Sequence, residues 1–328
     1  SVMAMEQNGP KLNLGGSLLV PYVQELAREP LTTIPPRYAR ADQDYVVISN
    51  TTSLPQVPVI DMQSLVSRDS ELEKLHNACK EWGFFQLINR GVSSVLLEKV
   101  KEIQELFNLP MEEKKKYWQQ AGDIEGFGQA FIVSEEQKLD WGDMFFIITL
   151  PAYLRKPHLF PNLPLPLALR DTLETYSAKM KNLEMKNLIL LAKALGMDQN
   201  DMRELFEEGL QSIRMNYYPP CPQPELVTCL YPHSDSNGLT ILLQINDIEG
   251  LQIRKDGNCA PINPLPNAFV INLGNTMEVI YHFTPTNGIY HSIEHGAMVN
   301  LKERVSIATF CSAKLDGDID PAPSLITP

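Results

Sequence analysis

The chain has 328 residues, a mass of 37.0 kDa, 44% hydrophobic residues and a formal net charge of −12. This length and composition provide for one large domain or two modest ones with a sizeable core. The acidic balance disfavours nucleic acid as a partner, because nucleic-acid-binding proteins carry a clustered basic face. No apolar stretch reaches membrane-spanning length, so we expect no membrane partner either.

The five cysteines are odd in number, widely spaced and free of any C-x-x-C pair. This pattern is typical of reduced thiols in a cytosolic protein rather than of a disulfide framework. The first sixteen residues lack a basic segment followed by an apolar core, so they do not resemble a signal peptide. We expect a cytoplasmic protein that is a monomer.

The first half of the chain predicts helices with two short strands. Residues 1–55 are polar and proline-rich, and we expect them to wrap over the surface. The run VPVIDM (57–62) predicts a strand at a sheet edge, since proline cannot donate to a ladder, and FFQLI (84–88) predicts a second strand. Apolar residues at helical spacing predict helices over 70–83, 93–107, 110–120, 169–196 and 200–207. The lysines at 114–116 follow two glutamates, which indicates a solvated helix face.

From residue 210 onward the pattern changes to short apolar or alternating runs separated by Pro, Gly and Asn. This texture is typical of an antiparallel β sandwich or barrel. We therefore divide one compact unit into an N-terminal region (1–110), a helical support region (111–209) and a catalytic β core (210–328). The expected strands cover 212–218, 239–245, 250–255, 268–274, 288–293 and 304–310.

A histidine and a carboxylate, His233 and Asp235, lie two positions apart and can face one metal ion from a strand. A third ligand would come from His282, His291 or His295. A face of two histidines and one carboxylate leaves positions open, which suits Fe(II) better than zinc. In a strand, His291 and His295 would lie roughly 13 Å apart, so only one of them can join the site.

Arg304 and Ser306 follow on a further strand, again two positions apart. A guanidinium beside a hydroxyl can bind a carboxylate through charge-assisted hydrogen bonds. A keto acid with two carboxylates could then chelate iron at one end and meet Arg304 at the other. A structural ion pair is the alternative for Arg304.

Several longer motifs resemble plant 2-oxoglutarate/Fe(II)-dependent dioxygenases, in the branch that contains senescence-related dioxygenases and the codeine and thebaine O-demethylases. The resemblance implies a mixed α and β fold with a double-stranded β-helix core (a distorted jelly roll) and flanking helices. The motifs that carry it include ACKEWGFFQLIN (78–89), EGFGQAF (125–131), NYYPPCPQP (216–224), EGLQIRKDG (249–257) and PLPNAFVINLG (264–274).

The resemblance also implies roles for single residues. His233, Asp235 and His295 match the iron ligands, with His295 preferred over His291 because of its local context. Arg304 and Ser306 match the clamp on the distal carboxylate of 2-oxoglutarate. Asn216 and Tyr218 match positions that contact 2-oxoglutarate from a facing strand, although Tyr218 could instead be a core aromatic. The implied cofactors are Fe(II), 2-oxoglutarate as co-substrate, O2, and ascorbate as reductant.

The implied reaction is hydroxylation or O-demethylation of a hydrophobic plant specialised metabolite of alkaloid or phenylpropanoid/flavonoid type. Co-substrate 2-oxoglutarate would be converted to succinate and CO2, and a hydroxylated O-methyl group would be lost as formaldehyde. Candidate pocket walls, each with a core role as the alternative, are Phe131, Phe145, Phe146 and Phe310.

Some positions depart from the family's pattern, namely Arg90, Cys259, Asn275 and Gly296. The segment YHFTP (281–285) resembles an insertion, which we expect to form a surface loop. The chain stops at SLITP, so we expect the C-terminal helix that covers the site in the family to be absent. These departures leave open a catalytically weakened member that only binds a small molecule. A zinc hydrolase is disfavoured, because no H-E-x-x-H motif is present.

Overall fold

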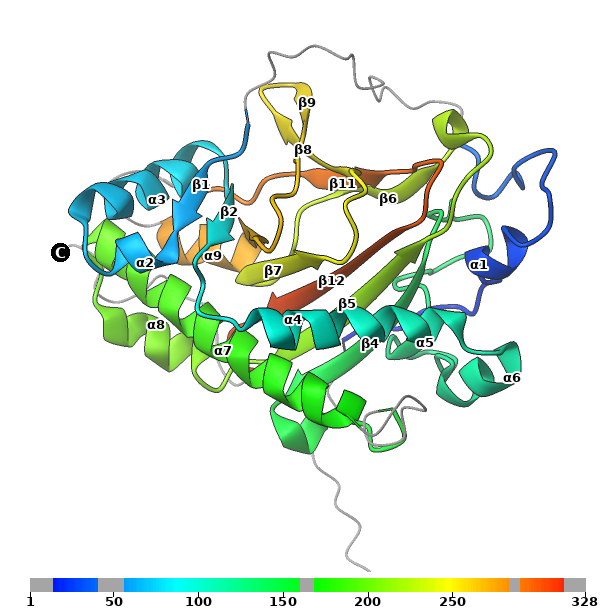
Figure 1. Cartoon of the computed structure of the whole chain (residues 1–328), viewed down its shortest axis with the longest axis horizontal. Coiled ribbons are helices and arrows are strands. Elements are labelled where there is room, and N and C mark those ends of the chain that lie inside the picture. Colours follow the sequence, from blue (N-terminus) through cyan, green and yellow to red (C-terminus); the bar gives the residue numbers. More distant parts are fainter. Residues whose placement is uncertain (1–13, 41–55, 160–167, 283–289, 316–328) are drawn as a thin grey trace, which may run out of the picture.

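The computed structural model of the chain describes residues 14–40, 56–159, 168–282 and 290–315. Two β-sheets lie above one another, and helices flank the larger sheet (Figure 1). The strands of the larger sheet, in spatial order, are β1 (Val59–Asp61), β2 (Phe84–Ile88), β10 (Phe269–Leu273), β7 (Leu239–Gln244), β12 (Arg304–Cys311), β5 (Gln211–Tyr218), β4 (Asp143–Leu150) and β3 (Gly126–Gly128). The smaller sheet contains β6 (Thr228–His233), β11 (His295–Met298), β8 (Leu251–Lys255) and β9 (Asn258–Pro261).

The strands pair antiparallel throughout, except for β1 and β2. This arrangement confirms the expected β-helix core, and β1 lies at the sheet edge as its proline-flanked sequence predicts. The larger sheet takes β1 to β4 from the first half of the chain and the others from the second half.

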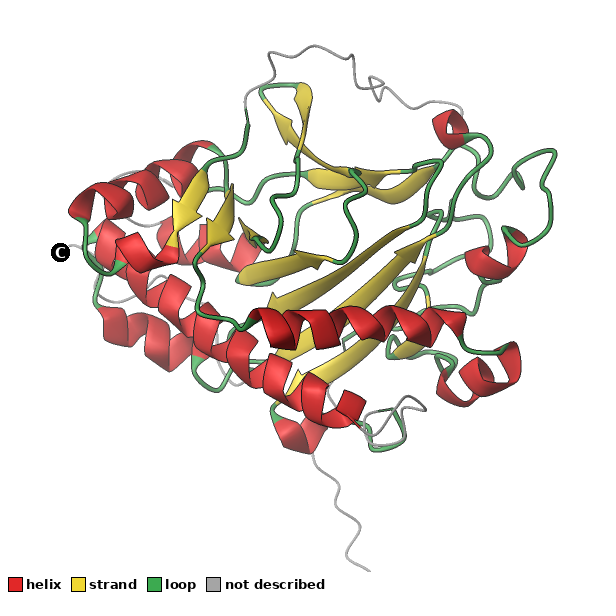
Figure 2. Ribbon diagram, in the orientation of Figure 1, coloured by secondary structure: helices red, strands yellow, loops and turns green. Residues whose placement is uncertain are grey.

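Helices pack on the outer face of the larger sheet, as Figure 2 shows. The longest, α7 (Ala168–Leu195), contacts β4, β7 and β12. None of the described helices is both long and apolar enough to cross a membrane. The other helices are α1 (Val23–Leu26), α2 (Met62–Leu65), α3 (Asp69–Glu81), α4 (Ser94–Lys101), α5 (Glu105–Asn108), α6 (Met111–Lys114), α8 (Gln199–Phe206) and α9 (Asn275–His282), with 3-10 turns η1 (Glu102–Gln104), η2 (Lys115–Tyr117), η3 (Ala152–Leu154) and η4 (Pro224–Leu226).

Alternate side chains on the strands of the larger sheet point to opposite faces, one toward the core and the other toward the functional site. On β5, Ile213 and Met215 are fully buried in the cluster between sheet and helices, so Arg214 and Asn216 face the other way, toward the smaller sheet. The same alternation on β12 directs Arg304 and the next even-numbered residues toward the smaller sheet. The site therefore lies between the two sheets.

Helix α3 ends where the sequence predicts, at a glycine. Gly83 has a φ of +61°, and a Cβ at this position would lie 2.5 Å from the carbonyl oxygen of His291. Only glycine fits both the left-handed backbone and this close approach. Gly83 thereby lets the chain segment that leads to His295 pass directly beside β2.

Several expectations were wrong. The helix expected over 110–120 is α6 followed by η2 and ends at Tyr117, and Asp235 lies beyond the end of β6 instead of sharing its strand with His233. Residues 290–293, the described part of the expected strand 288–293, have no regular structure, and β11 begins only at His295. Tyr281 is not part of a surface loop: it belongs to α9 and is fully buried, with its ring centroid 4.9 Å from that of Tyr290. Residues 283–285 lie outside the described residues. Lys114 is buried, contrary to the expected solvated face, and donates to Gln24 Oε1. Lys115 and Lys116 are exposed as expected, and they form ion pairs with Glu112 and Glu113.

Candidate active site

The side chains of His233, Asp235 and His295 converge between the two sheets. Register pairing of β6 with β11 places His233 directly opposite His295, and their ring centroids are 4.5 Å apart. Asp235 Oδ1 lies 3.3 Å from His233 Nε2 and 3.6 Å from His295 Nε2. One potential ligand atom from each residue lies within 4.8 Å of the other two.

Backbone carbonyls fix the orientation of both imidazole rings. His233 Nδ1 lies 2.9 Å from the Tyr231 carbonyl oxygen, and His295 Nδ1 lies 3.0 Å from the Ile293 carbonyl oxygen. Because a carbonyl only accepts, each Nδ1 carries a proton and each Nε2 is left to bind a cation. This is the arrangement that holds metal-binding histidines in place.

Asp235 is held in the same manner. Its Oδ2 accepts hydrogen bonds from Thr240 Oγ1 at 2.7 Å and from Asn272 Nδ2 at 2.8 Å. Both donors lie on strands of the larger sheet, so the carboxylate is fixed with Oδ1 turned toward the histidines.

The three groups shift one another's pKa values. Burial favours a raised pKa for Asp235, but the hydrogen bond with His233 and the charges of both imidazoles hold it well below its usual range. For His233, burial lowers the pKa, and the hydrogen bond and charge of Asp235 outweigh it, so the pKa is raised. For the more deeply buried His295, burial dominates and the pKa is lowered. A fixed anion between two imidazoles attracts a divalent cation for the same electrostatic reason.

His291 takes no part in this cluster. It is exposed, and its Nδ1 lies 3.5 Å from Glu278 Oε1. His291 thus lies outside the cluster of His233, Asp235 and His295, as we expected. The reason differs from the expected one, because His291 precedes β11 and does not share a strand with His295.

The residues expected to bind 2-oxoglutarate face one another across β5 and β12. Arg304 is opposite Tyr218, and Ser306 is opposite Asn216. Arg304 is buried, its Nη2 lies 3.4 Å from Gln244 Oε1, and its Cζ lies 5.4 Å from the centroid of the Tyr218 ring. Asn216 Nδ2 donates to Ser306 Oγ at 3.3 Å.

Two buried polar atoms in this group have no hydrogen-bond partner among the described residues. They are Arg304 Nε and Asn216 Oδ1. Buried polar atoms are normally paired, so their presence points to a polar ligand between the sheets. A guanidinium, a hydroxyl and an amide suit the carboxylate of a keto acid, and two imidazoles with one carboxylate suit Fe(II).

The pocket that contains these residues is lined from both sheets. Phe84 packs edge-on against His295, with 5.1 Å between ring centroids. Of the four candidate pocket walls, Phe310 lines this pocket, whereas Phe145 is fully buried in the core. Phe131 is 56% exposed and lines a neighbouring pocket. Phe146 belongs to neither set of lining residues.

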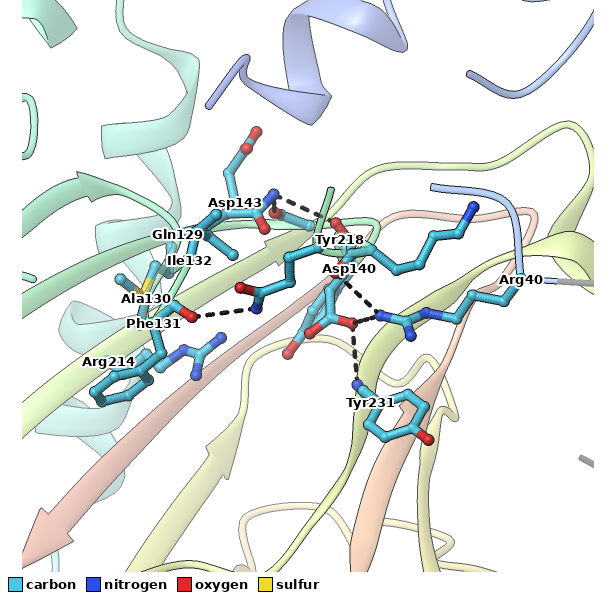
Figure 3. Close-up of a pocket in the computed structure, with 14 residues that line it drawn as sticks. Arg40, Gln129, Ala130, Phe131, Ile132, Asp140, Asp143, Arg214, Tyr218 and Tyr231 are labelled. Carbon is cyan, nitrogen blue, oxygen red and sulfur yellow. Dashed lines mark hydrogen bonds and ion pairs between the residues drawn. The ribbon is translucent and has the colours of Figure 1, made fainter. Parts of the chain in front are cut away.

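The neighbouring pocket was not foreseen from the sequence (Figure 3). It shares Arg214 and Tyr218 with the metal pocket. At its other end, Asp140 Oδ1 lies 3.1 Å from Arg40 Nη2 and accepts the backbone N–H of Tyr231 at 3.2 Å. Arg214 could have been identified from the β5 pattern, because it lies two residues before Asn216 and so shares its face.

The departures from the family pattern leave the ligand side chains in place. Arg90 stacks on Phe269, with its Cζ 4.7 Å from the ring centroid. Asn275 supports the site through its backbone, donating its N–H to the Asp235 carbonyl at 2.7 Å. A Cβ on Gly296 would lie 2.9 Å from the Leu230 carbonyl oxygen, so glycine fits the close pairing of β11 with β6.

Comparison with known proteins identifies the class that this fold and site define. Residues 57–163 match the family of non-haem dioxygenases in morphine synthesis, N-terminal region, and residues 209–313 match the 2OG-Fe(II) oxygenase superfamily. The chain belongs to the 2OG-Fe(II) oxygenase superfamily and is an oxidoreductase that depends on iron and 2-oxoglutarate.

Several similar proteins are named as O-demethylases. The chain is 56% identical to oxoglutarate-dependent flavonoid 7-O-demethylase 1 of Ocimum basilicum, over 96% of this chain and 83% of that protein. It is 53% identical to codeine O-demethylase of Papaver somniferum, over 97% of this chain and 89% of that protein. Among solved structures, JOX2 in complex with 2OG, Fe and JA superposes with a TM-score of 0.82 at 33% identity, over 94% of this chain and 88% of that one.

Proposed function

We propose that the protein oxidises a hydrophobic plant specialised metabolite of flavonoid or alkaloid type. Of the two reactions considered, hydroxylation and O-demethylation, we propose O-demethylation of a methoxy group. The observation that carries this proposal is the convergence of His233, Asp235 and His295 beside Arg304 on the facing sheet. The names of the similar demethylases support the substrate class.

In this proposal the two imidazole Nε2 atoms and Asp235 Oδ1 hold Fe(II), which supplies the activation of O2 when bound. Arg304, with Ser306 beside it, holds the distal carboxylate of 2-oxoglutarate, and Asn216 and Tyr218 orient the co-substrate from β5. The apolar walls of the pocket, Phe84 and Phe310 among them, exclude water from the reacting carbon.

The proposed O-demethylation has two steps, oxidation of the methyl carbon and loss of formaldehyde. One O2 and one 2-oxoglutarate convert R–O–CH3 into R–O–CH2OH, with succinate and CO2 as co-products. The hemiacetal C–O bond then breaks, and the proton of the CH2OH hydroxyl is transferred to the phenolic oxygen, which leaves R–OH and formaldehyde.

The test is the stoichiometry of products from the full chain supplied with Fe(II), 2-oxoglutarate, ascorbate and a panel of methoxyflavones and methoxylated alkaloids. Demethylation gives formaldehyde and succinate in equal amounts. Succinate with a hydroxylated product and no formaldehyde would show hydroxylation instead. No substrate-stimulated succinate with any compound would favour the alternative, a catalytically weakened protein that only binds small molecules.

A further inference from the structure

Asp140 connects the N-terminal segment to strand β6 of the smaller sheet. Among the described strands β6 pairs only with β11, so N–H groups on its other edge need partners from outside the sheet. Asp140 Oδ1 accepts one of them, the Tyr231 N–H, at 3.2 Å. The same oxygen lies 3.1 Å from Arg40 Nη2, and the Arg40 Cζ lies 4.6 Å from the centroid of the Tyr231 ring (Figure 3). Arg40 and Asp140 therefore hold Tyr231 at both its backbone and its ring.

The backbone on either side of Asp140 is fixed by hydrogen bonds of its own. The N–H of Leu139 donates to the Arg37 carbonyl at 3.0 Å. The N–H of Trp141 donates to the Thr228 carbonyl at 2.6 Å, and the Trp141 side chain is fully buried. Because both neighbours are held, the carboxylate of Asp140 is a fixed support instead of a freely moving loop side chain.

Tyr231 transmits this support to a proposed metal ligand. Its N–H is held by Asp140, and its carbonyl oxygen lies 2.9 Å from His233 Nδ1 and so sets the orientation of that imidazole. His295 has a different partner, since its Nδ1 lies 3.0 Å from the Ile293 carbonyl oxygen. Of the two histidines, His233 is therefore the one whose orientation depends on the position of Asp140.

We propose that Asp140 is a positioning residue for the metal centre: paired with Arg40, it fixes the backbone at Tyr231 and thereby holds His233 with Nε2 toward the metal. This inference rests on the proposed function, because it takes His233 as a metal ligand. Arg40 and Asp140 also line the neighbouring pocket. The wall of that pocket and one metal ligand thus share a single support.

The test is proton NMR of the full chain loaded with Co(II) and 2-oxoglutarate. The Nδ1–H of each Co(II)-bound histidine gives a strongly shifted signal that disappears on exchange with D2O. We expect two such signals, and the faster exchange should be that of His233, whose side chain is 36% exposed against 8% for His295. Asp140→Ala should raise the exchange rate of His233 about ten-fold or more and leave that of His295 unchanged, because only the first hydrogen bond loses its support.

Two further variants separate the hydrogen bond from the ion pair. Asp140→Asn keeps an oxygen that can accept the Tyr231 N–H, so the exchange rate of His233 should stay close to that of the wild type. Arg40→Met keeps the carboxylate and removes its ion pair, and it should raise the exchange rate of His233 in part. This variant carries the test if Asp140→Ala does not fold.

Glu135→Ala is the matched control, because Glu135 pairs with Arg37 across the same two segments while its side chain is 83% exposed. It should leave both exchange rates as in the wild type. Four results would overturn the assignment: no change in Asp140→Ala, an equal rise in both histidine signals, a rise in Asp140→Asn as large as in Asp140→Ala, or the same rise in Glu135→Ala.

Failure of the proposed function is seen separately. A wild type that shows neither shifted signal would overturn the metal site together with the role of Asp140. A wild type that shows both signals with Co(II), yet forms no succinate with Fe(II) in air, would overturn the proposed reaction alone and leave the positioning role to be decided by the exchange rates.

Discussion

Single side chains at this site act through partners that lie far away in the sequence. Arg304 is an example, because its buried guanidinium meets Gln244 and the Tyr218 ring while its Nε has no described partner. Asp235 is another, since Asn272, 37 residues away, fixes its second oxygen together with the nearby Thr240.

Arg304→Ala should weaken 2-oxoglutarate binding by about ten-fold to a hundred-fold and leave metal affinity nearly unchanged. The lost contact is a charge-assisted hydrogen bond, worth about 1.5–3 kcal/mol. Calorimetric titration of metal, then of 2-oxoglutarate, measures both affinities, with Arg304→Lys as the charge-retaining control. An equal loss of both affinities, together with a lower melting temperature, would mean that Arg304 serves the fold instead.

Thr240→Val removes one of two donors to Asp235 Oδ2 without changing the size of the side chain. We expect metal affinity to fall by about ten-fold or more, as is typical when a partner of a metal ligand is lost. Titration with Fe(II) under argon measures this. Thr276→Val is the control, because Thr276 donates to the Ser236 carbonyl instead of the carboxylate. If both variants bind metal as the wild type does, Asn272 alone is sufficient to orient Asp235.

At the scale of elements, the site depends on how residues 290–294 lead into β11. Gly83, at the end of α3, lies against this segment at the His291 carbonyl. His295 then enters β11 opposite His233, so a displacement at Gly83 would be transmitted to a proposed metal ligand.

Gly83→Ala should therefore lower both stability and metal affinity. The left-handed backbone alone costs an alanine about 1–2 kcal/mol, and the 2.5 Å contact adds to this. Gly91→Ala is a matched control: Gly91 also has a positive φ, +71°, but a Cβ there would meet nothing within 4 Å. Denaturant unfolding and metal titration of both variants separate the strain, which they share, from the contact, which only Gly83→Ala has. Equal effects of the two substitutions would show that the contact is unimportant.

At the scale of the whole molecule, stability depends on burial of polar groups between α7 and the larger sheet. Glu184 on α7 is fully buried, and its Oε1 lies 3.1 Å from Lys181 Nζ. Burial raises the pKa of Glu184 to about 7, an effect that Lys181 reduces but does not cancel. A carboxyl pKa raised on folding means that the folded state binds this proton more tightly than the unfolded state. The contribution of Glu184 to the free energy of unfolding should therefore fall as the pH rises from about 4.5 to about 7.

Glu184→Gln should remove this loss and stabilise the protein at pH 8 more than at pH 5. The difference is at most about 3 kcal/mol, from 1.36 kcal/mol for each pKa unit. Urea unfolding at the two pH values measures it, with the exposed Glu204→Gln on α8 as control. A variant less stable than the wild type at pH 8 would show that the pair with Lys181 outweighs the burial of the charge.

By itself the sequence determined the features that depend on neighbouring residues. The alternation along 304–310 placed Arg304 and Ser306 on one strand face, because strand geometry is local. His233 and Asp235 do lie together, but the strand argument for them was wrong, because β6 ends at His233 and Asp235 follows it outside the strand. Only the tertiary structure decided the features that depend on pairing between distant segments. Spacing could not choose between His291 and His295, since the choice depends on where β11 begins opposite β6. The buried position of Tyr281 and the pocket beside the metal site likewise arise from packing between segments that are remote in sequence, which no local pattern encodes.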